Sequence, residues 1–230
     1  MEDFALNSVY FATFLTFVTY GIGMFLKKKL RLRILNAMLI SIGLSIAVVV
    51  LLKVKFTVYQ NSARYLNYFL TPATVCLAVP LYEQFQTLKQ NWKAILGGII
   101  AGVLTNLVLV LGMCVVLSVG HKEYVSILPK SITTAIGLAL SQEMGGIVPI
   151  TMAMIIITGN LGNIFAEVLC RLFRIKDPVA RGIAVGTSSH VLGTTKAMEM
   201  GQVEGAMSSL SIAVAGILTV VGASIFAPLL

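Results

Sequence analysis

The sequence has little charge, and this shortage excludes more than any other feature. Only 11% of its 230 residues are Asp, Glu, Lys or Arg, whereas a soluble domain carries about 25%. The apolar share is 57%, above the roughly 45–50% of soluble domains. A soluble protein of this length needs a charged surface that so few ionisable residues cannot supply. The composition excludes a soluble enzyme and a disordered chain, and it predicts a membrane protein.

Cysteines and phosphate-binding motifs are also scarce. The three cysteines, Cys76, Cys114 and Cys170, lie in apolar runs and form no CxxC pair. Neither a disulfide framework nor a metal site is implied, so we expect reduced, buried thiols, no metal and no other cofactor. The phosphate-binding pattern GxxxxGK followed by Ser or Thr does not occur, which argues against an ATP-driven pump within this chain.

What the sequence does contain is a series of uncharged runs. A helix needs about 20 apolar residues to cross the hydrocarbon core of a bilayer, and five runs reach or approach this length. Three others are unusual, because one carries two prolines and two are short. The runs are residues 4–26, 34–52, 65–82, 94–120, 131–142, 144–166, 182–195 and 205–230. They predict an all-α polytopic membrane protein with about seven or eight membrane segments in a single integral membrane domain, residues 1–230.

The three unusual runs predict interrupted helices. Pro72 and Pro80 each remove a backbone donor from run 65–82 and disfavour helix at the preceding residue. Run 182–195 is rich in Gly, Ser and Thr, and run 131–142 is too short to cross. Irregular backbone in a membrane is tolerated only where protein or water satisfies it. We therefore expect two broken helices and a re-entrant segment that line a pathway; for any single run, an ordinary kinked helix is the alternative.

Two of the unusual runs occupy equivalent positions in the two halves of the chain. A shift of about 115 residues, half the chain, places run 65–82 on run 182–195. The loop charges give the paired segments opposite directions, which indicates an inverted repeat with halves of about 1–118 and 119–230. Broken helices of such repeats meet near the membrane midplane in carriers that rock or move like an elevator.

Basic residues predict the orientation. Cytoplasmic loops of membrane proteins collect Lys and Arg, so the net charge of +8 indicates loop bias, and we expect no nucleic acid partner. If the loops with most basic residues face the cytoplasm, the N-terminus and the loop 121–124 lie outside and the C-terminus is cytoplasmic. The eleven residues assigned to the cytoplasmic side are Lys27, Lys28, Lys29, Arg31, Arg33, Lys89, Lys93, Arg171, Arg174, Lys176 and Arg181.

The predicted breaks carry hydrogen-bond donors and no acidic residue. A helix that starts again after a break exposes N–H groups, and its dipole attracts anions. Together with hydroxyls and one or two cations, this suits a small carboxylate, whereas a metal ion would require carboxylates or a His cluster. The candidate substrate-binding residues are Thr71, Thr74, Lys130, Thr133, Thr134, Asn160, Thr187, Ser188, Ser189, His190 and Thr194.

Three ionisable residues have competing interpretations. His190 can hydrogen-bond a carbonyl as an inert group, contact substrate, or carry a proton for coupled transport. Glu143 is the second proton-coupling candidate, with solvation at the membrane surface as its alternative. Lys196 either lies near the site or extends toward the surface. No enzyme is expected, because the segment 186–190, GTSSH, lacks the last glycine of the nucleophile motif G-x-S-x-G and follows no predicted strand.

Four motifs in order resemble one known family. They are PATVCLAVPLY (72–82), LPKSITT (128–134) followed by GGI (145–147), ARGIAVGTSSH (180–190) with GT (193–194), and EGAMSSL (204–210). They are similar to motifs of the LrgB/CidB family of bacterial membrane proteins, and the resemblance covers about residues 5–230. It implies a multi-pass protein of the bacterial cell membrane, and it does not separate the LrgB and CidB branches.

The resemblance implies two kinds of function. Family members are named antiholin-like or holin-like partners of small LrgA/CidA membrane proteins, and are linked to murein hydrolase activity, autolysis and programmed cell death. Similar proteins are implicated in pyruvate uptake, and a plant relative is a plastid glycolate/glycerate transporter. Residues and resemblance together favour a small-monocarboxylate carrier that works by alternating access around crossed broken helices. The alternatives are a holin-like pore or regulator and a non-transporting scaffold. The expected partners are the carboxylate, the lipid bilayer, an LrgA/CidA-like protein and a second copy of this chain.

Overall fold

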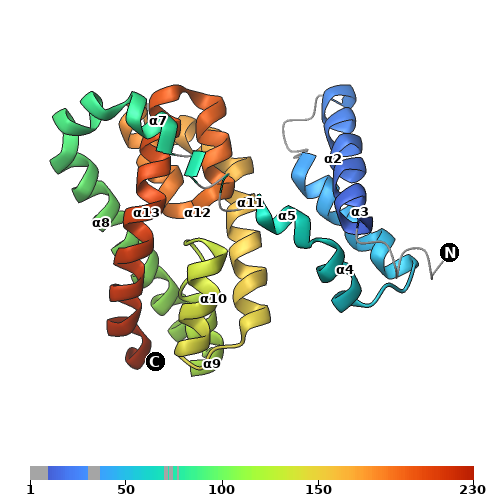
Figure 1. The fold of residues 1–230 in the computed structure, drawn as a ribbon. Coiled ribbons are helices and arrows are strands. Elements are labelled where there is room, and N and C mark those ends of the chain that lie inside the picture. Colours follow the sequence, from blue (N-terminus) through green and yellow to red (C-terminus); the bar gives the residue numbers. More distant parts are fainter. Residues whose placement is uncertain (1–9, 31–36, 70–71, 73–74, 77) are drawn as a thin grey trace. The chain divides into compact units, whose positions relative to one another are not determined.

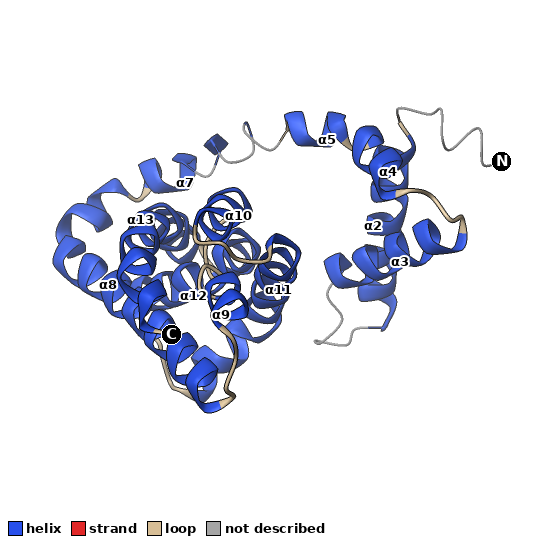
Figure 2. Cartoon of the chain, turned by 90° about the horizontal axis from the view of Figure 1, so that it is seen from below, coloured by secondary structure: helices blue, strands red, loops and turns tan. Residues whose placement is uncertain are grey.

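In the computed structural model of the chain, every described element is a helix (Figure 2). The structure describes residues 10–30, 37–69, 72, 75–76 and 78–230. The chain divides into two compact units, Met1–Cys76 and Leu77–Leu230, and each is considered by itself. The prediction of an all-α protein is confirmed for the described residues.

The first unit is built on two helices joined by hydroxyl contacts. Thr19 Oγ1 lies 3.0 Å from the Oγ atoms of both Ser41 and Ser45. Gly23 permits this close approach, because a Cβ at its position would meet the carbonyl of Ala37. The described helices of this unit are α2 (Phe11–Leu30), α3 (Ala37–Leu51), α4 (Phe56–Ser62) and α5 (Arg64–Tyr68).

The second unit holds the longer helices (Figure 1). Among the described residues, three helical segments are long and apolar enough to cross a membrane, namely Phe85–Val116, Val148–Leu172 and Gln202–Leu229. The helices of this unit are α7 (Ala78–Glu83), α8 (Phe85–Val116), α9 (His121–Ile127), α10 (Thr134–Glu143), α11 (Val148–Leu172), α12 (Pro178–Met200), α13 (Gln202–Phe226) and the 3-10 helix η1 (Ala227–Leu229). This is a polytopic membrane protein.

Two of the five predicted long spans are not among these segments. The described part of run 4–26 belongs to α2, whose last turn carries three lysines and so lowers its hydropathy. Run 34–52 corresponds to α3, in which Ile40–Leu51 forms a shorter apolar helix. The 15 residues of α3 cover about 22 Å, less than the roughly 30 Å of hydrocarbon. The total of seven or eight membrane segments stays a prediction.

Helix α8 is longer than predicted. It begins at Phe85, nine residues before run 94–120, because no proline or glycine interrupts the intervening sequence. Lys89 and Lys93, expected in a loop, therefore lie on its first turns. One face is buried at four-residue spacing and the apolar face next to it is exposed, as lipid contact requires. The buried stripe is Ile95, Ile99, Val103 and Leu107, and the exposed face includes Leu96, Ile100, Leu104 and Val108.

Helix α12 lies among α8, α11 and α13 and is folded into a hairpin (Figure 2). A Cβ at Gly193 would lie 3.1 Å from Val185 Cγ1, eight residues earlier, whereas eight residues of a continuous helix rise about 12 Å. Gly186 and Thr194, from the two halves, both contact Ser208 of α13. The halves, 178–189 and 191–200, are therefore packed side by side, with His190 at the tip. Each half is at most about 18 Å long, too short to cross a bilayer.

Helices α9 and α10 form a second hairpin at the opposite end of this unit (Figure 1). Its base is held by α11, since the backbone N–H of Ile147 donates to Ser126 Oγ at 2.7 Å. Its tip, residues 128–133, reaches the middle of α8, where Lys130 contacts Asn106. The two hairpins thus approach each other from opposite ends, with Lys130 on one tip and His190 on the other.

The hairpin form of α12 bears on two predicted positions in the membrane. The C-terminal ends of α8 and α13 lie at the same end of the unit, because Tyr124 Oη, just after α8, donates to the carbonyl of Phe226 at 2.9 Å. The predictions that the loop 121–124 is outside and the C-terminus is cytoplasmic are therefore incompatible. The error has one source: the prediction treats run 182–195 as a crossing, whereas α12 returns to the end from which it starts.

The cysteines follow the prediction in part. All three thiols are free, and Cys114 and Cys170 are buried. Cys76 is exposed, so its predicted burial is wrong. An apolar run identifies residues that avoid water, and it does not distinguish a side chain covered by protein from one that faces lipid.

Candidate functional site

The interruption predicted for run 182–195 occurs at His190, the tip of α12. Its backbone has φ 43° and ψ −142°, outside the helical region. A positive φ costs a non-glycine residue on the order of 1–3 kcal/mol and requires support from its surroundings. His190 Nε2 lies 3.0 Å from the Ile155 carbonyl oxygen of α11, and Thr194 Oγ1 donates to the His190 carbonyl at 2.9 Å. The inert carbonyl contact considered for His190 is thus present, and the ring is buried.

Two glycines of α11 make room for this tip. A Cβ at Gly159 would lie 2.6 Å from Cε1 and 2.7 Å from Nε2 of the His190 ring. A Cβ at Gly162 would collide with the Ser189 side chain. The small residues let the hairpin approach the α11 backbone closely enough for His190 to reach a helix carbonyl.

The hydroxyls before the tip belong to the first half of α12. Thr187 Oγ1 donates to the Ile183 carbonyl at 2.8 Å, and Ser188 Oγ donates to the Ala184 carbonyl at 2.7 Å. Such bonds to the preceding turn are common for Ser and Thr in helices. Ser188 is exposed and its Oγ lies 2.9 Å from that of the buried Ser189. Thr187 and Ser188 therefore use their hydroxyl protons within α12 and retain oxygen lone pairs.

Lys130 is the cation at the tip of the other hairpin. Its half-buried ammonium donates to Asn106 Oδ1 at 2.6 Å and lies 3.2 Å from Ser131 Oγ. Ser131 Oγ also donates to Asn106 Oδ1, at 3.1 Å. In the part of the chain that the structure describes, no carboxylate forms an ion pair with Lys130. Ile155 of α11 lies beside both hairpins: its carbonyl oxygen is 3.0 Å from His190 Nε2, and a Cβ at Gly137, on the first turn of α10, would lie 2.6 Å from its Cδ1.

The remaining predicted residues are distributed less closely. Thr133 and Thr134 begin α10, are half-buried, and Thr133 makes no side-chain capping bond. Glu143 ends α10 and is exposed. Thr71 and Thr74 lie outside the described residues. The structure brings Ser189, His190 and Thr194 together at the tip of α12, and Asn160 lies beside Gly159 on α11.

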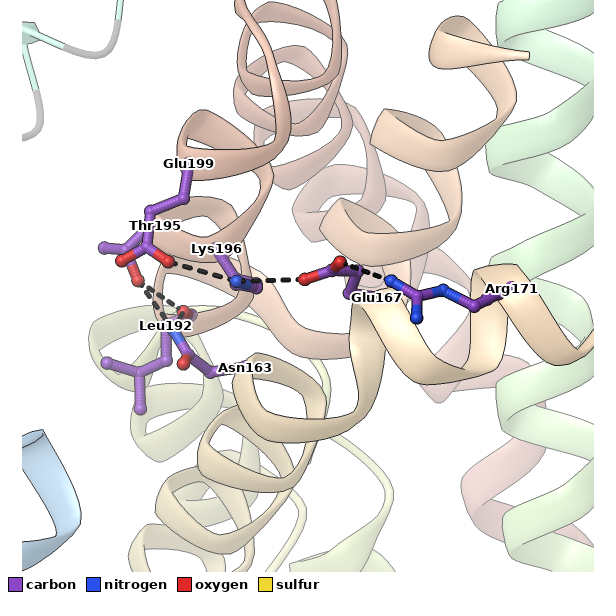
Figure 3. A network of polar contacts seen from close by, with 7 residues as sticks. All are labelled: Asn163, Glu167, Arg171, Leu192, Thr195, Lys196 and Glu199. Carbon is purple, nitrogen blue, oxygen red and sulfur yellow. Dashed lines mark hydrogen bonds and ion pairs between the residues drawn. The ribbon is translucent and has the colours of Figure 1, made fainter. Parts of the chain in front are cut away.

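Lys196 belongs to a polar network between α11 and the second half of α12 (Figure 3). Its ammonium lies 3.1 Å from Glu199 Oε2 and 3.4 Å from Glu167 Oε2, and Glu167 also pairs with Arg171 at 2.9 Å. Two carboxylates therefore match this charge, which leaves Lys130 as the better candidate for an anion. Exposed ion pairs of this kind contribute about 0–1 kcal/mol each.

Two polar residues with contacts inside this helical unit are absent from the predicted site residues. Asn106 is a polar residue in the middle of the apolar run 94–120, and this position alone would have identified it as a candidate site residue. Glu204 is buried and lies 3.8 Å from Arg181 Nη1, joining the first turns of α12 and α13. Arg181 also donates from Nε to the Ile175 carbonyl at 2.7 Å. The sequence predicted Arg181 only as one of the basic residues of a cytoplasmic loop, whereas its side chain bonds to the backbone and to Glu204.

The site is equipped to attract an anion. The second half of α12 begins after the break, and the first N–H groups of a helix have no partner within it. Such N–H groups carry a partial positive charge, and Lys130 supplies a full one at the other tip. Among the described residues, no cluster of three His, Cys, Asp or Glu side chains exists that can hold a metal ion.

The fold and site define a class: a polytopic α-helical membrane protein with two helical hairpins that enter one helical unit from opposite ends. The chain belongs to the LrgB-like family, whose profile matches residues 16–229, so the resemblance stated above is confirmed. It is 34% identical over 224 residues to the antiholin-like protein LrgB of Bacillus subtilis strain 168, covering 97% of both chains. It is 33% identical over 220 residues to the antiholin-like protein LrgB of Bacillus mycoides strain KBAB4, covering 95% of this chain and 96% of that one. The protein of the same name from Bacillus cereus strain B4264 has the same identity and coverage. No solved structure matches.

Proposed function

We propose that this protein carries small monocarboxylates, of the size of pyruvate, glycolate or glycerate, across the bacterial cell membrane. Lys130 is the observation that carries the proposal. Its ammonium is half-buried, is hydrogen-bonded by neutral groups, and has no carboxylate partner among the described residues. A charge removed from water is stabilised by a counterion, and one carboxylate suffices for one ammonium.

The opposite tip supplies the other half of the site. His190 and the N-terminal end of the second half of α12 lie at the tip of the other hairpin, and both hairpins contact Ile155 of α11. Asn160, Thr133, Thr134, Ser189 and Thr194 complete the proposed set on the described helices. Thr71 and Thr74 lie outside the described residues and stay candidates from the sequence. Family resemblance to proteins implicated in pyruvate and glycolate transport points to the same ligand size.

Alternating access follows from two hairpins that approach from opposite ends. We place α9–α10 and α12 as re-entrant hairpins, each closing the site toward one side of the membrane. Movement of α12 with α11 and α13, by rocking or in an elevator-like manner, opens one side at a time. The proposal includes the inverted repeat and an outside N-terminus. With that orientation the C-terminus, at the same end as the loop 121–124, is also outside.

A second candidate function comes from the names of the relatives. Proteins 33–34% identical to this chain are called antiholin-like, which supports a pore or a regulator of murein hydrolase activity acting with a small LrgA/CidA-like protein or as a homodimer. A saturable site and a non-selective pore differ in their transport kinetics, so one preparation distinguishes them.

The experiment is counterflow of labelled pyruvate, glycolate and glycerate into liposomes that contain the purified protein, with and without a pH gradient. A carrier gives saturable uptake that unlabelled substrate competes for, with no leakage of a trapped dye. Dye leakage without saturable uptake establishes the pore instead. If the protein gives neither uptake nor leakage, the regulator is the remaining function. Stimulation by a proton gradient that is lost in Glu143→Gln or His190→Gln identifies the coupling group.

A matched pair of lysine variants tests the site. Lys130→Met removes the tip cation, and we expect uptake to fall at least about tenfold through loss of one charge-assisted contact. Lys122→Met is the control, because Lys122 lies on the exposed first turn of α9 in the same hairpin. Equal uptake by the two variants would remove Lys130 from the site.

A further inference from the structure

The first turns of α8 include a segment that the rest of the second unit leaves exposed on every side. Each residue from 89 to 94 is exposed, and this range is longer than one helical turn of about 3.6 residues. The segment stands at the edge of the unit, on the side away from α11 (Figures 1 and 2). It carries Lys89, Lys93 and Trp92, the only tryptophan of the chain. These side chains are therefore available to whatever surrounds the unit.

The two lysines form a compact positive charge. They are four residues apart, which places them on one face of the helix with their Cβ atoms about 5–6 Å apart. Lys93 Nζ lies 5.7 Å from the centre of the Trp92 ring. Among the residues that the structure describes, no carboxylate forms an ion pair with Lys89 or Lys93. The pair has the charge and the spacing to hold one phosphate group between its ammonium groups.

The length of α8 places this charge at the level of the lipid headgroups. The uncharged part of the helix, residues 94–116, is about 34 Å long, close to the roughly 30 Å of hydrocarbon in a bilayer. Lys93 and Lys89 come directly before it, within about 8 Å along the helix axis. The headgroup layer is about 5–8 Å thick on each side of the hydrocarbon, so both ammonium groups reach the phosphates of one leaflet.

The aromatic side chains agree with this depth. Trp and Tyr collect at the interface between membrane and water, where one end of the ring is apolar and the other is hydrated. Trp92 is exposed beside the first residue of the uncharged part, and Phe85 and Tyr82 are exposed further toward water. An interfacial ring between two lysines without a carboxylate partner favours a lipid of net negative charge.

We propose that the first turns of α8 bind the headgroup of an anionic phospholipid. Lys89 and Lys93 hold its phosphate, and the Trp92 ring lies against the start of its acyl chains. Phosphatidylglycerol leaves this phosphate charge uncompensated, whereas the choline group of phosphatidylcholine brings a second positive charge to the lysines. A lysine near an anionic membrane surface strengthens binding about fivefold, so two lysines predict a preference of about tenfold or more. The inference is independent of which substrate the protein carries.

The single tryptophan gives a direct test. The whole purified chain is placed in vesicles of phosphatidylcholine and phosphatidylglycerol, in which one of the two lipids carries bromine atoms on its acyl chains close to the headgroup. Bromine quenches the fluorescence of an indole only when the labelled lipid lies next to it, so quenching with each labelled lipid gives the relative binding constant at Trp92. We expect phosphatidylglycerol to be favoured about tenfold or more. An increase of salt from about 0.1 M to about 0.5 M should reduce this preference, because it screens exposed charges.

Lysine variants assign the preference to this segment. In the double variant Lys89→Gln/Lys93→Gln, the preference for phosphatidylglycerol should fall below about twofold, since both ammonium groups are lost. Lys122→Gln is the control, because Lys122 is an exposed lysine of α9, which follows the opposite end of α8. We expect this control to keep the preference of the unaltered protein.

Three results would overturn the inference. Equal quenching by the two labelled lipids in the unaltered protein shows that the segment does not select an anionic lipid. Weak quenching by both shows that protein, from another part of the chain or a second copy, covers Trp92. A preference that persists in the double variant shows that other cations attract the lipid. The comparison of lipids and of salt in the unaltered protein decides the question even if the double variant does not fold, which size-exclusion chromatography in detergent reveals.

Discussion

The contact between Gly159 and His190 gives a sharp prediction for Gly159→Ala. The added Cβ would lie 2.6 Å from His190 Cε1 and 2.7 Å from Leu192 Cδ1, whereas carbon atoms pack at about 3.5–4.0 Å. The ring must therefore move by about 1 Å, and its 3.0 Å contact with the Ile155 carbonyl is the one it loses. Overpacking costs about 1–3 kcal/mol, and an unpaired buried polar group costs about 1–3 kcal/mol more.

A helical alanine returns about 1 kcal/mol relative to glycine, so the net loss is about 3 kcal/mol. For a chain of this size that lowers Tm by about 6–12 °C, measured by thermal unfolding of the purified protein in detergent. Gly97→Ala is the control, because its Cβ meets nothing within 4 Å and it lies on an exposed part of α8. We expect the Tm of Gly97→Ala to be equal to that of the unaltered protein or slightly higher. A Gly159→Ala protein as stable as Gly97→Ala would refute the packing of the hairpin tip against α11.

Three further predictions concern the same unit. His190→Gly should be more stable than His190→Ala by about 1 kcal/mol, because both lose the ring and only glycine takes a positive φ without strain; identical Tm values would place the break elsewhere. Glu204→Gln should lower Tm by about 4 °C or more relative to Glu199→Gln, since Glu204 is a buried member of an ion pair and Glu199 is exposed. Asn106→Leu removes the acceptor of the Lys130 ammonium and should raise the KM of monocarboxylate uptake about fivefold or more; an unchanged KM would show that Asn106 does not position this cation.

Sequence patterns predicted the long helices because their signal is local. Runs 94–120, 144–166 and 205–230 became α8, α11 and α13 with shifted ends, since a membrane helix needs only a sufficient number of apolar residues. The helix ends in the structure differ from the ends of the uncharged runs, because hydropathy does not indicate at which residue the helical backbone ends. Lys89 and Lys93 are charged and still helical, as nothing before them breaks the helix.

The reversal of α12 was beyond what hydropathy can indicate. The Gly- and Ser-rich run 182–195 predicted an interruption, and His190 provides it. Whether the chain continues across the membrane after the interruption or folds back depends on contacts with residues distant in the sequence. Gly159 and Gly162 of α11, and Ser208 of α13, hold the two halves together. This one difference makes the predicted sides of the loop 121–124 and of the C-terminus incompatible.

At the candidate site, too, the sequence indicates individual residues, and the structure shows which of them have partners. Residue type and a position within an uncharged run, or directly before one, are enough to indicate Asn160, His190 and Lys130. The sequence could not show that Lys196 is matched by two carboxylates while Lys130 is not, because ion pairing depends on which helices are neighbours. It also could not show that Thr187 and Ser188 bond to their own helix.

By itself the sequence determined that this is an all-helical membrane protein of the LrgB-like family with polar interruptions in its second half. Composition and run length decide this, because the bilayer acts on each segment separately. Only the tertiary structure decided that α9–α10 and α12 are hairpins with Lys130 and His190 at their tips. That arrangement depends on close packing between helices distant in sequence, where a glycine or a single acceptor changes which groups meet.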